Sequence, residues 1–187
     1  MIFLFNIFIN CYTYPIIFSL APWDSQKETI TEINISEETV SIGSYAFYYF
    51  TSLTEIKLPS KLITIGEYAF SGCSQLTHIN IPSEVTTIKI SAFSYCTNLN
   101  SIELSSKTTE IGINAFDHCI NLDKIELPEN LTIIRASTFS DCLNIKTINL
   151  SDKITVIQSK AFYNCYSLTN FTLPSNLLRI GSYSFYF

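Results

Sequence analysis

The chain has 187 residues, 47% of them hydrophobic, and a formal net charge of −5. Its eleven basic residues are scattered between Lys27 and Arg179 and form no cluster. This distribution argues against nucleic acid and against an anionic membrane surface as partners. The apolar content is ample for a hydrophobic core. By its length alone, the chain would form one or two domains.

Residues 1–26 differ from the rest of the chain and carry no charged side chain before Asp24. Their long apolar run is typical of a signal peptide, with Ser19-Leu20-Ala21 as a plausible small-residue cleavage site. No Lys or Arg precedes the run, so an uncleaved membrane anchor and an irregular cap over the first coil remain alternatives. We expect contact with a membrane only through this segment, and only if it stays uncleaved.

From residue 27 onward, one pattern recurs every 23 residues. Its clearest copy, residues 53–75, reads LTEIKLPSKLITIGEYAFSGCSQ. The other copies open, with no insertion or deletion, at Ile30, Leu76, Leu99, Leu122, Ile145 and Leu168. Self-similarity at a fixed period of this length indicates a solenoid, so residues 27–187 are predicted to form a single stack of coils.

The first half of each copy is predicted to contain two strands. Apolar and polar residues alternate towards the end of residues 53–58, which indicates a strand with one buried face. Pro59 ends that strand, because proline lacks an N–H group and has a fixed φ. Residues 62–65 read as a second, short strand.

The second half of each copy is predicted to be a bend and a turn. Gly66 closes the short strand, and a glycine there suggests either positive φ or a close approach of the backbone. Phe70, Cys73 and the leucine that opens the next copy follow at intervals of three residues. This interval suits a helical or 3₁₀ turn with one face directed inward.

The pattern LTxIxLPxxLxxIGxxAFxxCxx resembles the repeat of BspA-like leucine-rich repeat proteins, which are surface antigens of bacteria and protists. The predicted fold is a strand-dominated α/β leucine-rich-repeat solenoid. It is a right-handed stack of about seven coils with a parallel sheet on one face and short helical turns. The sequence stops at Phe187, before the next cysteine position, so the last coil is predicted to be incomplete.

The recurring cysteines are the most prominent candidates for chemistry: Cys73, Cys96, Cys119, Cys142 and Cys165. They are predicted to fill the core, and disulfides between neighbouring coils remain an alternative. Their spacing matches no metal motif, and we expect no metal or cofactor. His118 lies beside Cys119, but adjacent residues on a turn point to different faces, so we expect no nucleophile–base pair and no catalysis.

The outward positions of the first strand vary from copy to copy, whereas the core positions repeat. These positions supply the candidate binding residues: Glu55, Lys57, His78, Asn80, Glu103, Lys124 and Glu126. The prediction is a non-catalytic module, extracellular or at the cell surface, that binds a protein or glycan on a cell surface or matrix. The alternative is a structural or fragmentary repeat protein without a specific ligand. Self-association through the open C-terminal end is a further expectation, because an uncovered coil exposes its strand edges.

Overall fold

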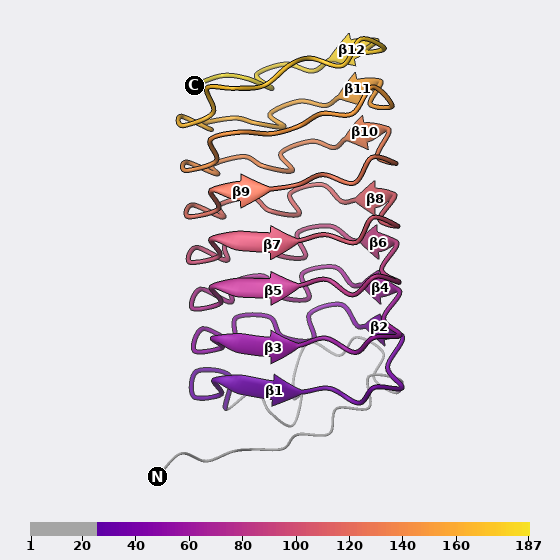
Figure 1. Ribbon diagram of the computed structural model, residues 1–187. Helices are drawn as coiled ribbons and strands as arrows, with labels where there is room; N and C mark the ends of the chain where they lie inside the picture. The colour runs from indigo at the N-terminus through magenta and orange to yellow at the C-terminus, as the bar shows by residue number, and fades with distance from the viewer. Residues whose placement is uncertain (1–25) are drawn as a thin grey trace.

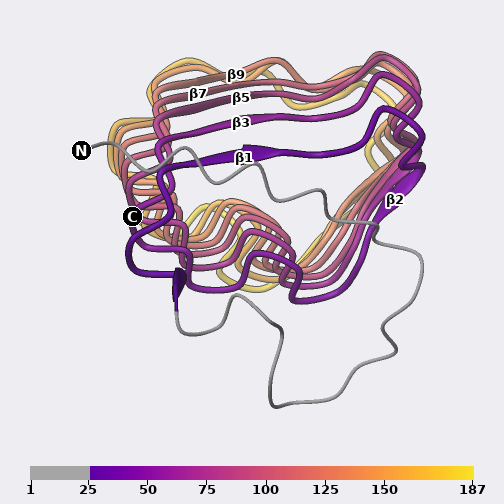
Figure 2. The ribbon, with the colours of Figure 1, turned by 90° about the horizontal axis from the view of Figure 1, so that it is seen from below.

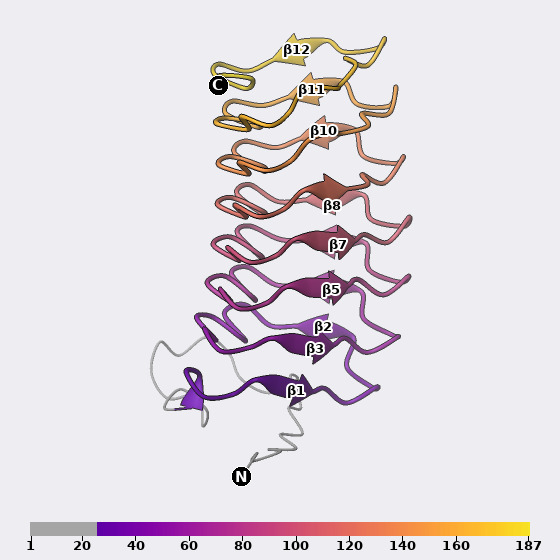
Figure 3. The ribbon, with the colours of Figure 1, turned by 60° about the vertical axis from the view of Figure 1, so that its left-hand side comes forward.

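The computed structural model describes residues 26–187, so the predictions for residues 1–25, including the signal peptide, lie outside the described residues. The described chain winds into coils stacked along one axis (Figures 1 and 3). One row of strands crosses the near side of the stack from left to right, and a second row returns on the far side while the chain rises (Figures 1 and 2). The stack is therefore right-handed, as predicted.

The first row of strands forms one side of the stack. Its strands are β1 (Glu32–Asn34), β3 (Glu55–Lys57), β5 (His78–Asn80), β7 (Ser101–Glu103) and β9 (Lys124–Ile125). Two parallel bridges, from Lys124 to Thr147 and from Thr147 to Asn170, continue the row through the later coils. In each three-residue strand of this row the central isoleucine is buried and at least one neighbour is exposed, which explains the alternation in the sequence.

The second row is made of two-residue strands. They are β2 (Ser41–Ile42), β4 (Thr64–Ile65), β6 (Thr87–Ile88), β8 (Glu110–Ile111), β10 (Ile133–Ile134), β11 (Val156–Ile157) and β12 (Arg179–Ile180). Every pairing in both rows is parallel. Partners such as Ile33 and Ile56 stand one repeat apart. The predicted solenoid and its register are therefore confirmed, and parallel strands occupy two sides of the stack.

The remaining side, where helical turns were predicted, contains no α-helix among residues 26–187. The bond from Ala69 N–H to the Gly66 carbonyl, at 3.3 Å, spans three residues, as in a 3₁₀ turn. The residues between these turn bonds do not continue a helix, because their N–H groups donate to the next coil. The helical part of the predicted α/β class is thus confined to isolated turns.

Bonds between coils on this turn side form a third ladder. The N–H groups of Tyr68, Phe70 and Gly72 donate to the carbonyls of the next coil at 2.9, 2.8 and 2.8 Å. Tyr68 and Gly72 have φ of 53° and 78°, and the corresponding residues of other coils are also left-handed. The left-handed residues therefore recur four residues apart, at the first and third donors of the ladder in each coil.

A continuous core fills the stack, and a row of phenylalanines runs along it. The rings of Phe70 and Phe93 stack at 5.2 Å between centroids, and those of Phe93 and Phe116 at 5.6 Å, with nearly parallel planes. All three rings are fully buried. One core therefore connects the described coils.

The recurring glycine serves close approach of coils and not positive φ. A Cβ placed on Gly112 would lie 2.5 Å from the backbone of Lys89 and Ile90 in the preceding coil. Gly66 is equally crowded by the backbone of Gly43, whereas a Cβ on Gly43 would meet nothing within 4 Å. Of the two explanations that the sequence allowed, the structure selects contact between coils.

We expect Gly112→Ala to lower the free energy of unfolding by about 1–3 kcal/mol, because the added methyl group must push two backbones apart. Gly43→Ala is the matched control, since it alters the same repeat position where space is open. Urea unfolding of both variants measures the difference. Equal stability of the two variants would show that the coils can separate there without cost.

Candidate functional site

The seven predicted binding residues lie together on the outward side of the first row, a surface that we call the strand face. Its members are Glu55, Lys57, His78, Asn80, Glu103, Lys124 and Glu126, and all of them are exposed. Pairing of β5, β7 and β9 places His78 beside Ser101 and Ser101 beside Lys124. Neighbouring parallel strands are about 4.8 Å apart, so one extended ligand could contact several coils at once.

Polar contacts on the strand face are weakly constrained. Lys124 Nζ lies 3.1 Å from the Glu126 carboxylate, and both side chains are more than 70% exposed. His78 Nδ1 lies 3.0 Å from the Ser101 hydroxyl. Exposed ion pairs contribute little to stability, so these side chains are available to exchange their partners for groups of a ligand.

The two best-formed hollows among residues 26–187 do not lie on the strand face. Those hollows lie beside the second row of strands. One is lined in part by Lys89, Glu110 and Arg135, and the other by Gln158 and Arg179. The strand face is therefore a broad surface, which suits a macromolecule better than a small substrate that needs enclosure.

The five repeat cysteines are free thiols in the core, so the disulfide alternative does not hold in this structure. Each thiol donates to a phenylalanine carbonyl of the preceding coil, as Cys119 Sγ does to the Phe93 oxygen at 3.1 Å. Burial raises the pKa of Cys119 well above its ordinary range. Such a thiol is a poor nucleophile, because the thiolate is the reactive form.

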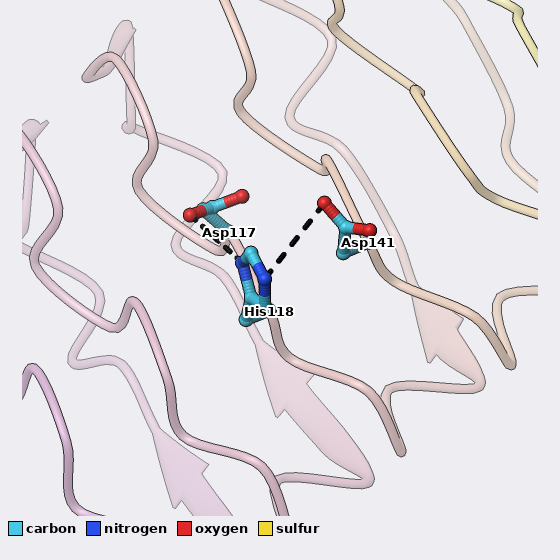
Figure 4. Close-up of side chains that lie close together, drawn as sticks. All are labelled: Asp117, His118 and Asp141. Atoms are coloured by element: carbon cyan, nitrogen blue, oxygen red, sulfur yellow. Dashed lines mark ion pairs between the residues drawn. The ribbon is translucent and has the colours of Figure 1, made fainter.

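His118 does not pair with Cys119, as expected, but it joins a cluster that the sequence analysis missed. We call Asp117, His118 and Asp141 the turn cluster, and Figure 4 shows both carboxylates beside the imidazole. His118 Nδ1 lies 3.0 Å from Asp117 Oδ2, and His118 Nε2 lies 4.0 Å from Asp141 Oδ2. The first contact is short, yet its geometry is not that of a hydrogen bond.

The turn cluster concentrates negative charge in a half-buried place. Burial raises the pKa of Asp117, and the contacts with His118 and Ser140 oppose that shift. Burial is also the main cause of a raised pKa at Tyr95, and the nearby Asp117, Tyr49 and Asp141 raise that pKa further. The ring of Tyr95 stacks on His118 at 4.4 Å. The imidazole therefore sits between an aromatic face and two carboxylates.

The turn cluster was missed because motif spacing was the only test for a metal or catalytic group. His118 and Asp141 are 23 residues apart, which matches no ligand motif. In a solenoid, that same spacing places them at one position of successive coils. Reading the turn positions as rows, as was done for the strands, would have found the pair.

Two parallel strand rows, a repeating buried core and a variable exposed face define a leucine-rich-repeat solenoid. The chain matches the family described as "BspA type Leucine rich repeat region" over residues 25–142 and 91–187, with six copies. It belongs to this BspA-type leucine-rich repeat family. A comparison with curated proteins found no match.

Solved structures agree with this assignment. A leucine-rich repeat protein from Bacteroides ovatus ATCC 8483 is 32% identical, with a TM-score of 0.78 over 81% of this chain and 39% of that one. The chain thus spans about two fifths of that relative's length. The leucine-rich repeat protein of T. pallidum is 26% identical, with a TM-score of 0.76 over 81% of this chain and 73% of that one.

A third structure is described as a leucine-rich cell surface protein from Faecalibacterium prausnitzii A2-165. It is 22% identical and covers 83% of this chain and 64% of that one, with a TM-score of 0.39. The family assignment rests on the repeat match and on the Bacteroides ovatus structure.

Proposed function

We propose that the chain is a non-catalytic binding module, secreted or displayed at the cell surface, that recognises a protein or glycan through the strand face. One observation carries this proposal. Core positions such as Ile56, Ile79 and Ile102 repeat from coil to coil, whereas the exposed neighbours in the same strands vary in charge and size. Packing constrains the first set only, so the second set is free to fit a ligand.

The chemistry of the strand face favours specificity through polar contacts. Acidic, basic and amide side chains lie interleaved on it, and such arrangements select a complementary partner more than they add affinity. Nucleic acid is not a suitable ligand, because the basic residues are scattered and the net charge is −5. The alternative, a structural repeat protein without a ligand, predicts a folded chain that attaches to nothing.

We expect the double variant Glu103→Lys and Glu126→Lys to reduce attachment of the full chain to cultured cells and to immobilised extracellular matrix at least tenfold. Both carboxylates are exposed on the strand face, so reversal changes the surface presented to the ligand and not the core. Labelled protein retained after washing measures attachment. Thermal unfolding should change little, because exposed substitutions usually have small effects on stability.

The matched control is Glu84→Lys and Glu129→Lys, which makes the same change in net charge at exposed positions outside the strand face. This control should attach like the parent chain. Equal attachment by the strand-face variant and the parent would show that the wrong face was chosen. Failure of the folded parent to attach to either material would favour the alternative without a ligand.

We also propose that two copies of the chain associate through the last coil. Leu173, Leu178 and Ile180 on the last coil are 49%, 83% and 47% exposed, and large exposed apolar patches mark interaction sites. A second copy of the chain could cover them. A sedimentation coefficient that stays constant with protein concentration would remove this proposal.

A further inference from the structure

The turn cluster brings together three side chains whose atoms commonly bind metals in proteins. One oxygen of each carboxylate and one imidazole nitrogen all lie within 4.8 Å of one another. His118 and Asp141 occupy the same position in successive coils, and Asp117 directly precedes His118. The ladder on the turn side fixes all three backbones, because Tyr95 N–H donates to the Asp117 carbonyl at 2.8 Å and His118 N–H to the Ser140 carbonyl at 2.9 Å.

We propose that Asp117, His118 and Asp141 form a binding site for one divalent transition-metal ion such as Zn²⁺. Imidazole nitrogen and carboxylate oxygen are both ordinary ligands of Zn²⁺, at about 2.0–2.2 Å. Three protein ligands leave a fourth position for water or for a group from a partner. A dication also balances the two carboxylates while the imidazole stays neutral.

The distances fit such an ion after local adjustment. Two ligands at about 2.1 Å from a tetrahedral metal are roughly 3.4 Å apart. His118 Nδ1 and Asp117 Oδ2 are 3.0 Å apart, so this pair needs to open only slightly. All ligand atoms of the turn cluster lie within 4.8 Å of one another, so Asp141 must approach the ion by up to about 1.4 Å. Its side chain is 23% exposed and not enclosed by the core, so a side-chain rotation of this size is feasible.

A further observation points to His118 Nδ1 as the ligand atom. This nitrogen is buried, and its 3.0 Å contact with Asp117 does not have the geometry of a hydrogen bond. Buried polar atoms usually make a hydrogen bond, so one that does not needs an explanation. A metal ion bound to Nδ1 and Asp117 supplies one. Asp141, whose carboxylate lies 4.0 Å from Nε2, then turns towards the ion as the third ligand.

Supporting contacts orient the ligands. Asp141 Oδ2 accepts a hydrogen bond from the Ser140 hydroxyl at 2.7 Å, and Oδ1 accepts one from the Asn164 amide at 2.7 Å. Tyr95 holds the imidazole plane by stacking. Such outer contacts set the direction of metal ligands and are a usual part of metal sites. Ligands and supporting contacts together span four successive coils, and a bound ion would itself link the coil of Asp117 and His118 to that of Asp141.

Titration of the full chain with Co²⁺ tests the site, because Co²⁺ reports its ligands by visible absorption. We expect binding with weak visible bands and without the strong near-ultraviolet band of cobalt–thiolate bonds, and we expect Zn²⁺ to displace the Co²⁺. A thiolate band would place the ion at cysteines and overturn the proposal. Absence of binding at millimolar Co²⁺ would overturn it as well.

Variants separate this site from adventitious binding. Asp141→Asn keeps the shape of the side chain and should weaken Co²⁺ binding at least tenfold, and His118→Asn should do the same. His78→Asn, which changes the other histidine, should bind like the parent chain. Circular dichroism establishes that each variant is folded, and Asp117→Asn replaces any that is not. Unchanged affinity in the turn-cluster variants, or a loss in His78→Asn, would contradict the assignment.

Discussion

Truncation of Phe93 to alanine is expected to lower the free energy of unfolding by about 3–5 kcal/mol. The ring is fully buried and stacks on Phe70 at 5.2 Å and on Phe116 at 5.6 Å. Its removal therefore leaves a cavity between two coils that the ladders hold at fixed spacing. The surrounding chain cannot collapse into the space, so the cavity adds to the loss of buried apolar surface. Denaturant unfolding measures the effect.

Phe185→Ala is the matched control, because it removes the same ring from the same repeat position where the ring is partly exposed. Phe185 stacks on Phe162 at 5.2 Å and on Phe171 at 4.7 Å. We expect a clearly smaller loss there, since less surface is removed from contact with protein. Equal losses at both positions would mean that the phenylalanine row is not a continuous core with a buried middle.

Alkaline pH is expected to destabilise the fold steeply. Burial raises the pKa of Cys73 and of Cys165 to about 12, and that of the three cysteines between them well above the ordinary range. In the unfolded chain these thiols titrate near pH ~8.5. The contribution to stability is therefore fully present below that pH and is lost as the pH rises towards the folded-state pKa values. Each thiol should remove about 1.4 kcal/mol per pH unit, or roughly 7 kcal/mol per unit for the five thiols together.

The variant Cys119→Ala isolates one of these thiols. The substitution also lowers stability at neutral pH, because a packed group is removed. The quantity to compare is therefore the slope of the free energy of unfolding against pH. Between pH 9 and pH 11 the slope should be smaller than that of the parent by about 1.4 kcal/mol per pH unit. An unchanged slope would show that the Cys119 thiol ionises as easily in the folded chain as in the unfolded one.

The periodic sequence predicted most of the fold, because each core position is repeated in every coil. Alternation around Ile56 and Ile79 gave the first row of strands, and the fixed interval gave the parallel register. The strand face followed directly, since outward neighbours of a buried residue must be exposed. Its ligand does not follow from any of these residues, because solvent exposure permits many side chains without selecting among partners.

The turn side could not be predicted to the same depth. Tyr68, Lys160 and Asp141 all take left-handed φ, although only Asp has an intrinsic tendency to do so. The ladder between coils imposes that conformation, so the local sequence carries no common signal for it. The turn cluster depends on this backbone, and its members come together only once the coils are stacked.

The ladder on the turn side also has a direction. The N–H groups at positions such as Tyr68 and Phe70 point to the following coil, and the carbonyls of the residues just before them, Glu67 and Ala69, receive bonds from the preceding coil. Peptide dipoles of about 3.5 D each therefore add along the axis, as they do in an α-helix. The turn side is then an electrically polar column, with its positive pole towards the higher-numbered coils and its negative pole towards the first. The second row contains peptides of the opposite direction, because Gly66 N–H donates to the Ile42 carbonyl of the preceding coil and the Ile65 carbonyl accepts from Lys89 of the following one. The polarity is therefore a property of the turn side and not of the whole stack.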